Sequence, residues 1–187
     1  MLKHDDVVLR AFEATDCDLL FAMANDMPLI EMAAREPPRP QPRQVFEERI
    51  SRAFNAPFTG ANWALEFLIE RNGAGIGIAG LYEMDRVNSV VEIGIAIGMA
   101  AERRKGAATS ATLLLVRYAF DTLNFRRIVA NVKASNAPAV LLAEKLGLAR
   151  EGCLRQHRWR DGHFEDLLVF GLLRDDWEGY GEPRTLP

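Results

Sequence analysis

Basic and small residues gather at residues 103–110, which read Arg-Arg-Lys-Gly-Ala-Ala-Thr-Ser. The apolar run that follows them, up to Phe120, is typical of a buried helix, so this segment would form a loop and the first turn of that helix. The N-terminus of a helix presents unpaired N–H groups and the positive end of the helix dipole, and it therefore binds anions, phosphate above all. Gly106 and Ala108 would let a phosphate approach the backbone closely. The segment therefore predicts a phosphate-binding loop.

One carboxylate, Glu92, lies in the strand that we predict just before this loop, over residues 90–98. Bulky and small side chains alternate there, so that Glu92 shares the small face with Gly94 and Ala96, which would leave room for a substrate. A carboxylate buried in such a place would have a raised pKa and could act as a general base. The alternative is a strand glutamate in a surface salt bridge.

The composition limits the kind of protein. A length of 187 residues fits one domain with a proper core. The net charge of −3 argues against a general nucleic-acid binder. Three histidines and two distant cysteines, Cys17 and Cys153, offer neither a zinc spacing nor a disulfide framework, so we expect no metal. Because the chain has few cysteines, no apolar signal region and no run of about 20 apolar residues, we expect a cytoplasmic protein without a membrane contact.

The elements around this centre alternate between helices and strands. We predict strands over residues 7–12, 63–71, 74–83, 90–98, 127–133, 150–160 and 163–173. We predict helices over residues 15–34, 45–54, 109–120 and from Ser135 or Asn136 to Gly147. Asn72-Gly73 and Asp161-Gly162 each suit a type I′ hairpin turn. Residues 1–187 would therefore form a single α/β (α+β) domain with a loose tail over 179–187.

Two further segments invite a functional interpretation. Residues 75–80 match the dinucleotide fingerprint G-x-G-x-x-G, but they lie inside a predicted strand and do not open a helix. We therefore reject a dinucleotide site and expect close packing or a bulge there. Residues 35–43 contain four prolines and the arginines Arg35, Arg39 and Arg43. They predict an extended surface loop, which is either a plain connector or the rim of an entrance for an anionic group.

The order strand, R-x-x-G-x-A loop, helix, strand, Asn-bearing turn, helix and hairpin resembles the GNAT superfamily of acetyl-CoA-dependent N-acetyltransferases, in particular its RimJ/RimL-like branch. The matching segments are EIGIAIG at 92–98, RRKGAA at 103–108, RRIVANV at 126–132, SNAPAVLLAEKLGLAREG at 135–152 and RDGHFEDLLVFGLLRDDW at 160–177. The resemblance is dense from Tyr82 to Trp177, whereas the N-terminal third agrees only in the order of its elements. It implies the GNAT fold, a central mixed, mostly antiparallel twisted sheet that is splayed between strands 4 and 5 and flanked by about four helices.

The resemblance also implies roles for single residues. Acetyl-CoA would be the cosubstrate, with its pyrophosphate on the loop and its pantetheine arm on the exposed edge of the strand at 90–98, paired with the backbone of Ile97 and Met99. The cofactor-binding residues would be Ile97, Met99, Arg103, Arg104, Lys105, Gly106, Ala107, Ala108, Thr109 and Asn136. Asn136 would contact the cofactor with its side chain, unless it is a plain N-cap. Glu92 would take the proton of the attacking amine, and a backbone N–H between Ile95 and Ile97 would meet the oxyanion.

The chain departs from the family pattern at two positions. Ala143 stands where many relatives carry a tyrosine that protonates the leaving thiolate, and Ala139 stands where many carry a serine. A thiol with a pKa of about 8.5 can leave without that help. We therefore expect transfer of an acetyl group to a primary amine by direct attack in a ternary complex. The acceptor would be a protein N-terminus, a polyamine, an amino sugar or an antibiotic, and neither a nucleic acid nor a membrane would be a partner.

Two alternative functions remain open. The chain could be a catalytically degenerate acyl-CoA-binding module that regulates or scaffolds a partner, an interpretation motivated by the two alanines. It could also be a nucleotide-binding protein that uses residues 103–109 as a phosphate loop, although the Walker pattern is absent. A homodimer is open as well, since we interpret Trp159, Phe164 and Trp177 as packing or dimer contacts.

Overall fold

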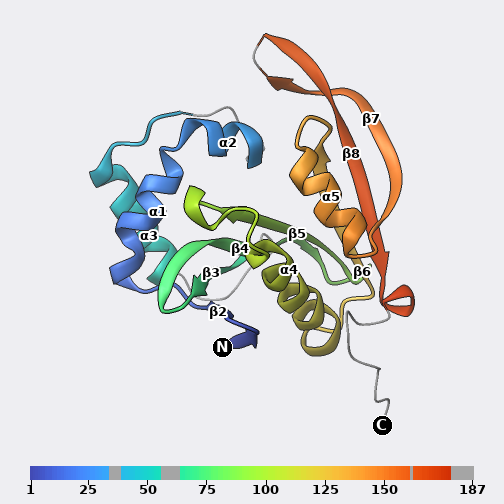
Figure 1. Cartoon of the computed structure of the whole chain (residues 1–187), viewed down its shortest axis with the longest axis horizontal. Helices are drawn as coiled ribbons and strands as arrows, with labels where there is room; N and C mark the ends of the chain where they lie inside the picture. Colours follow the sequence, from blue (N-terminus) through green and yellow to red (C-terminus); the bar gives the residue numbers. More distant parts are fainter. Residues whose placement is uncertain (34–38, 56–63, 161, 178–187) are drawn as a thin grey trace.

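The computed structural model describes residues 1–33, 39–55, 64–160 and 162–177. Its strands are β1 Leu2–His4, β2 Val7–Arg10, β3 Leu65–Arg71, β4 Ala74–Asp85, β5 Val90–Ile97, β6 Arg127–Lys133, β7 Ala149–Arg160 and β8 His163–Leu173. Its α-helices are α1 Cys17–Ala24, α2 Met27–Ala33, α3 Arg43–Asn55, α4 Ala107–Arg117 and α5 Ala137–Lys145. The strands form one eight-stranded sheet in the order β1-β2-β3-β4-β5-β6-β8-β7 (Figure 1). The chain therefore has the mixed, mostly antiparallel sheet that the resemblance implies.

The sheet separates at its centre, between β5 and β6. These two strands form its parallel pair, and their register covers only Val90, Val91 and Glu92, opposite residues 127–129. Among the described residues no pairing joins β5 and β6 beyond that point, although both strands continue for several residues. The predicted splay is confirmed, because the fourth and fifth strands of the prediction are β5 and β6. The short strand β1 was missing from the prediction.

The two faces of the sheet carry different helices. Neighbouring residues of a strand point to opposite faces, and in β3 Leu68 packs with Leu20 of α1 and Phe46 of α3, whereas Ile69 belongs to the main core. That core contains the buried residues of α4 and the inner side of α5. Helices α4 and α5 therefore cover one face, and the N-terminal helices cover the other (Figure 1).

The N-terminal helical region differs from the prediction. The single helix expected up to residue 34 is interrupted at Asn25 and Asp26. The Asn25 amide group donates to the Phe21 carbonyl, and its oxygen accepts the Gln41 N–H at 2.8 Å. The Asp26 carboxylate then accepts the Leu29 N–H at 3.1 Å, which caps a new helix, α2. Two helices therefore replace one because side chains at the break satisfy the free backbone groups.

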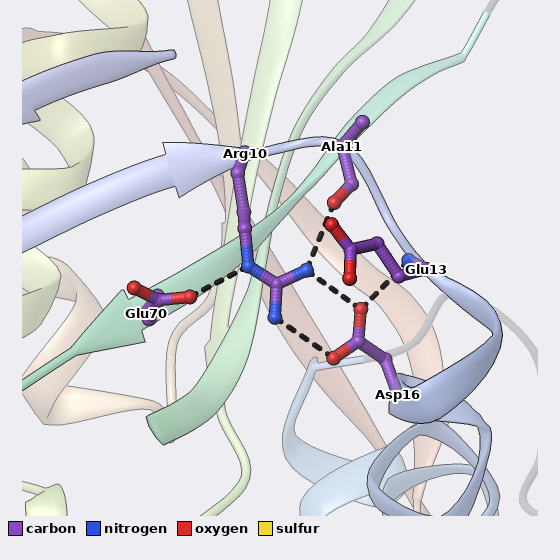
Figure 2. Close-up of polar contacts among 5 residues, drawn as sticks. All are labelled: Arg10, Ala11, Glu13, Asp16 and Glu70. Carbon is purple, nitrogen blue, oxygen red and sulfur yellow. Dashed lines mark hydrogen bonds and ion pairs between the residues drawn. The ribbon is translucent and has the colours of Figure 1, made fainter. Parts of the chain in front are cut away.

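An ion-pair network fixes the start of α1 relative to strands β2 and β3 (Figure 2). The Arg10 guanidinium at the end of β2 donates to both carboxylate oxygens of Asp16, at 2.8 and 2.9 Å, and to Glu70 of β3 at 2.6 Å. Asp16 also accepts the Glu13 N–H at 2.8 Å. The bonds from Arg10 hold the pKa of the Asp16 carboxyl below its usual range, against the opposing effect of burial. The network therefore joins β2, β3 and the start of α1.

Two sequence interpretations are confirmed by the hairpin of β3 and β4. Asn72 and Gly73 both have positive φ angles, 52° and 78°, as a type I′ turn requires. The G-x-G-x-x-G segment lies entirely within β4. A Cβ atom on Gly77 would overlap the carbonyl oxygen of Ala96 on β5, so the glycine permits close strand packing and belongs to no helix-opening loop.

Other predicted features are corrected or lie outside the described residues. Arg43 begins α3, where it pairs with Asp18 at 2.7 Å and Glu47 at 3.0 Å, so it belongs to a helix and not to an entrance loop. Arg35, Trp63 and the tail over 179–187 lie outside the described residues. Trp177 is buried, which agrees with a packing role. No helix in the described part of the chain is long and apolar enough to cross a membrane.

Candidate acetyl-transfer site

A cavity of about 850 Å³ lies where β5 and β6 separate. Helices α1, α2 and α5 supply about half of its apolar wall, and strands β5 and β6 supply much of the rest. Its polar lining residues are Glu66, Tyr82, Glu83, Glu92, Thr112, Asn131, Lys133, Asn136 and Arg158. A mostly apolar cavity with a few convergent polar groups is the usual form of a small-molecule site.

Glu92 lies in this cavity, at the last residue pair before the strands separate. The side chain is half-buried, and its Oε2 accepts a hydrogen bond from Asn131 Nδ2 at 2.9 Å. Asn131 lies two residues beyond Val129, the partner of Glu92 in the parallel register, so both side chains are on one face. Asn131 was not predicted as a site residue. The available signal was its alternation with the buried Ile128, Ala130 and Val132.

The small face of β5 is less open than the sequence suggested. A Cβ atom on Gly94 would lie 2.9 Å from the ring of Tyr82, which is the cross-strand partner of Glu92. The Tyr82 hydroxyl donates to Glu66 of β3 at 2.8 Å. A Cβ atom on Gly98 would overlap Met23 of α1. The Tyr82 ring therefore takes up the space beside Gly94, although Gly94 and Ala96 still line the cavity. That these small residues leave room for the substrate stays a prediction.

The loop before α4 has the form expected of an anion site. Gly106 precedes the first helical residue with a φ of 89°, and it has no side chain that could cap the helix. The Ser110 N–H bonds to the Gly106 carbonyl at 3.1 Å, so the amides of residues 107–109 precede the hydrogen-bonded turn. A Cβ atom at Gly106 would meet nothing within 4 Å. Arg104 and Lys105 are exposed beside it. The helix terminus is thus open to a ligand.

Arg103 makes specific contacts at the start of the loop. Its guanidinium donates to the carbonyls of Ile97 at 3.0 Å and Gly98 at 3.1 Å, and it lies 3.6 Å from the Asp26 carboxylate. It therefore ties the loop to the end of β5. The Met99 N–H donates to the Ile76 carbonyl on β4. The Ile97 carbonyl and the Met99 N–H are consequently engaged within the protein, and the edge of β5 that faces the gap begins after Glu92.

Asn136 is the N-cap of α5, the role given above as the alternative to a contact with the cofactor. Its side-chain oxygen accepts the Ala139 N–H at 3.2 Å, and its amide group also reaches the Met32 carbonyl of α2 at 3.5 Å. Asn136 nevertheless lines the cavity, as do Ala139 and Ala143. Its role as a side-chain ligand of the cofactor stays a prediction.

Two basic residues that were not predicted as site residues lie further along the cavity. They are Lys133 of β6 and Arg158 of β7. Within the described ranges no group of three or more His, Cys, Asp or Glu side chains is arranged to hold a metal ion.

Comparison with known proteins agrees with this geometry. The family model described as acetyltransferase (GNAT) domain matches residues 6–149. The "Uncharacterized N-acetyltransferase p20" of Bacillus licheniformis is 28% identical over 178 residues, which cover 95% of this chain and 98% of that protein. The "Putative ribosomal N-acetyltransferase YdaF" of Bacillus subtilis is 29% identical over 140 residues, 75% of each protein.

A solved structure resembles the whole fold. It is the spermidine N-acetyltransferase from Vibrio cholerae in complex with CoA and spermine, with a TM-score of 0.81 and 23% identity. The match covers 93% of this chain and 99% of that one. At this level of identity the likeness establishes the architecture.

Proposed function

The chain belongs to the acetyltransferase (GNAT) family and is an N-acetyltransferase, and from that premise we propose that it moves the acetyl group of acetyl-CoA to a primary amine by direct attack in a ternary complex. One observation carries the proposal. The Glu92 carboxylate lies in a cavity at the point where β5 loses its partner β6. A proton acceptor and an open strand edge are thereby brought to one place.

The residues present fit acetyl-CoA as the cosubstrate. The uncapped amides of residues 107–109, with Arg104 and Lys105 beside them, would hold the pyrophosphate. The edge of β5 beyond Glu92 would pair with the amides of the pantetheine arm, as an added strand does. The Vibrio cholerae protein of the same fold, whose structure holds CoA, supports a CoA ester as the ligand. When bound, acetyl-CoA supplies the activated thioester.

The protein's own residues then handle the proton. An alkylamine with a pKa of about 10 is mostly protonated near neutral pH, so it must lose a proton before it can attack. Glu92 would accept that proton, directly or through water, and the bond from Asn131 holds the carboxylate in the gap. Ala139 and Ala143 provide no acid for the leaving thiolate. We therefore propose that the thiolate leaves unprotonated or takes its proton from water.

The test is a thiol-release assay with acetyl-CoA and a panel of amines. The panel contains a polyamine, an amino sugar, an aminoglycoside and short peptides with free N-termini. Release of CoA with at least one amine, with intersecting initial-rate patterns, supports direct transfer in a ternary complex. A parallel-line pattern would indicate an acetylated enzyme and refute it.

The second candidate is a degenerate acyl-CoA-binding module, which the two alanines favour. In that case acetyl-CoA would raise the melting temperature, because it binds only the folded state. No amine would then release thiol, and Glu92→Gln would change nothing measurable.

A further inference from the structure

A group of cations lies beyond Asn131, at the end of the cavity formed by β6 and β7. Lys133 and Arg158 line the cavity there, and Arg160 lies on the same face of β7 as Arg158. The Lys133 ammonium donates to the Glu31 carbonyl of α2. Its pKa is lowered, first by desolvation and further by Arg160 and Arg158, while the carboxylates of Glu165 and Glu31 act against the shift. These charges are therefore close enough to affect one another.

The two carboxylates do not neutralise this group. Glu165 is buried beneath it, and its Oε2 accepts from the Ser135 hydroxyl at 2.5 Å and from the Ser135 N–H at 3.3 Å. Arg160 donates to the same hydroxyl at 2.9 Å. With Lys133, Arg158 and Arg160 against Glu31 and Glu165, one positive charge is in excess.

Arg158 carries that excess. Its side chain is half-buried against the cavity, and within the described part of the chain it makes neither a hydrogen bond nor an ion pair. A guanidinium has five N–H donors, and without a protein acceptor those of Arg158 are available to a ligand. Carboxylate and phosphate are the groups whose geometry matches it. A ligand in the cavity could supply such a group.

The position of the cations relative to Glu92 determines how far the anionic group of an acceptor must lie from its amine. Lys133 lies two residues beyond Asn131 on the same face of β6, which is about 7 Å along a strand. Asn131 itself bonds to Glu92. The opposite end of the cavity carries the carboxylates of Glu66 and Glu92. The cavity is thus acidic where the amine would react and basic about 7 Å beyond Asn131, the residue that bonds to Glu92.

We infer that the acceptor is a primary amine that also carries a carboxylate or phosphate, and that Arg158 and Lys133 bind this anionic group while the amine lies at Glu92. This inference rests on the proposed function. It predicts that this chain does not favour an acceptor such as spermidine. Spermidine is the substrate in the name of an Escherichia coli relative that is 29% identical over 111 residues. A polycation would bring a second ammonium group to Arg158.

Two sources could provide this chemistry. One is a small amino acid whose amine and carboxylate are several bonds apart. The other is a polypeptide N-terminus with an acidic side chain in its second residue.

The experiment compares three amines of equal length in the thiol-release assay, namely 5-aminopentanoate, pentylamine and cadaverine. They end in a carboxylate, a methyl group and a second ammonium group. We expect kcat/KM for 5-aminopentanoate to exceed that for pentylamine by about tenfold or more, since one charge-assisted pair contributes at least that much. The peptides Ser-Asp-Ala and Ser-Asn-Ala form a second arm. A preference for the Asp peptide that exceeds the preference among the small amines identifies a polypeptide N-terminus as the source.

Substitutions locate the effect. Arg158→Gln should remove the preference for the anionic acceptor, and Arg158→Glu should reverse it toward cadaverine. Arg155→Gln is the matched control, because Arg155 is exposed on the same strand and does not line the cavity. It should keep the wild-type preference. The wild-type comparison does not depend on the variants, so a variant that misfolds leaves the test intact.

The outcomes are distinguishable. If cadaverine or pentylamine is the better acceptor of wild type, or if Arg158→Gln changes all three amines alike, the inference is refuted and the proposed function stands. If acetyl-CoA binds and no amine of either panel releases thiol, the proposed function is refuted and the inference falls with it.

Discussion

The Arg10–Asp16–Glu70 network makes a quantitative prediction about stability. Asp16→Asn removes a carboxylate that accepts two bonds from Arg10 and one from the Glu13 N–H. The side chains of Arg10 and Asp16 are only 16% and 9% exposed, so solvent does little to replace those bonds. Hydrogen bonds to charged groups contribute about 1.5–3 kcal/mol each, and Asn keeps part of the acceptor capacity. We expect a loss of about 3 kcal/mol, or a melting temperature lower by about 6–12 °C for a chain of this size.

The pH dependence of this loss tests its cause. The pKa of Asp16 is lowered in the folded state, chiefly by the bonds from Arg10. The stabilisation is therefore fully present above the unfolded pKa of about 3.9 and disappears as the pH falls through the lower, folded value. The difference between wild type and Asp16→Asn should stay constant from pH 8 to about pH 5 and shrink below that.

Urea unfolding at several pH values, followed by circular dichroism, measures both quantities. The control is Asp18→Asn, two residues away, where the carboxylate is 84% exposed and pairs with Arg43. Its effect should be much smaller, since exposed pairs contribute little. Equal effects of the two substitutions, or a difference that does not shrink in acid, would refute the reasoning.

Three further predictions concern the site and the sheet. Gly106→Asp should weaken CoA binding about tenfold or more in calorimetry, because it places an anion at the pyrophosphate. Asn tolerates the same positive φ, so Gly106→Asn should bind CoA nearly normally. An equal loss of affinity in both variants would point to backbone strain. Glu92→Gln should lower turnover about a hundredfold or more, most at the acid end of the pH–rate profile, with cofactor affinity retained. Asn131→Ala should shift the same profile because it removes the hydrogen bond to Glu92. An unaltered profile in both variants would place the base elsewhere. Gly77→Ala should destabilise by more than about 2 kcal/mol because its Cβ meets backbone, while Gly73→Ala should cost about 1 kcal/mol from its positive φ alone; a reversed order in urea unfolding would refute the packing argument.

The sequence predicted the central part of the molecule because its signals are local. The strand, loop and helix from residue 90 to 117 follow from alternation, from charge and from one glycine, all within a short window. The hairpin at Asn72-Gly73 follows from the dipeptide itself. The break before α2 also has a local signal, a capping Asp26 followed by Pro28, which the helical period concealed.

The surroundings of Glu92 could not be predicted, because they depend on register between strands. Tyr82 faces Glu92 only in the observed pairing of β4 with β5, which contains an irregularity after Tyr82. Asn131 reaches Glu92 only because the parallel register sets Glu92 opposite Val129. Arg158 comes to the cavity through β7, whose own pairing shifts between Leu154 and Arg158. A single sequence carries no signal for such offsets.

The three residue pairs that join β5 to β6 have a consequence for the sheet as a whole. They connect an antiparallel half of five strands to one of three strands. A pantetheine arm in the gap would form the backbone hydrogen bonds that β5 and β6 do not form with each other. The cosubstrate would then act as an additional strand of the sheet. Deuterium exchange at residues 93–97 would then slow when CoA binds. The fold would therefore be completed by a molecule that is consumed in every catalytic cycle.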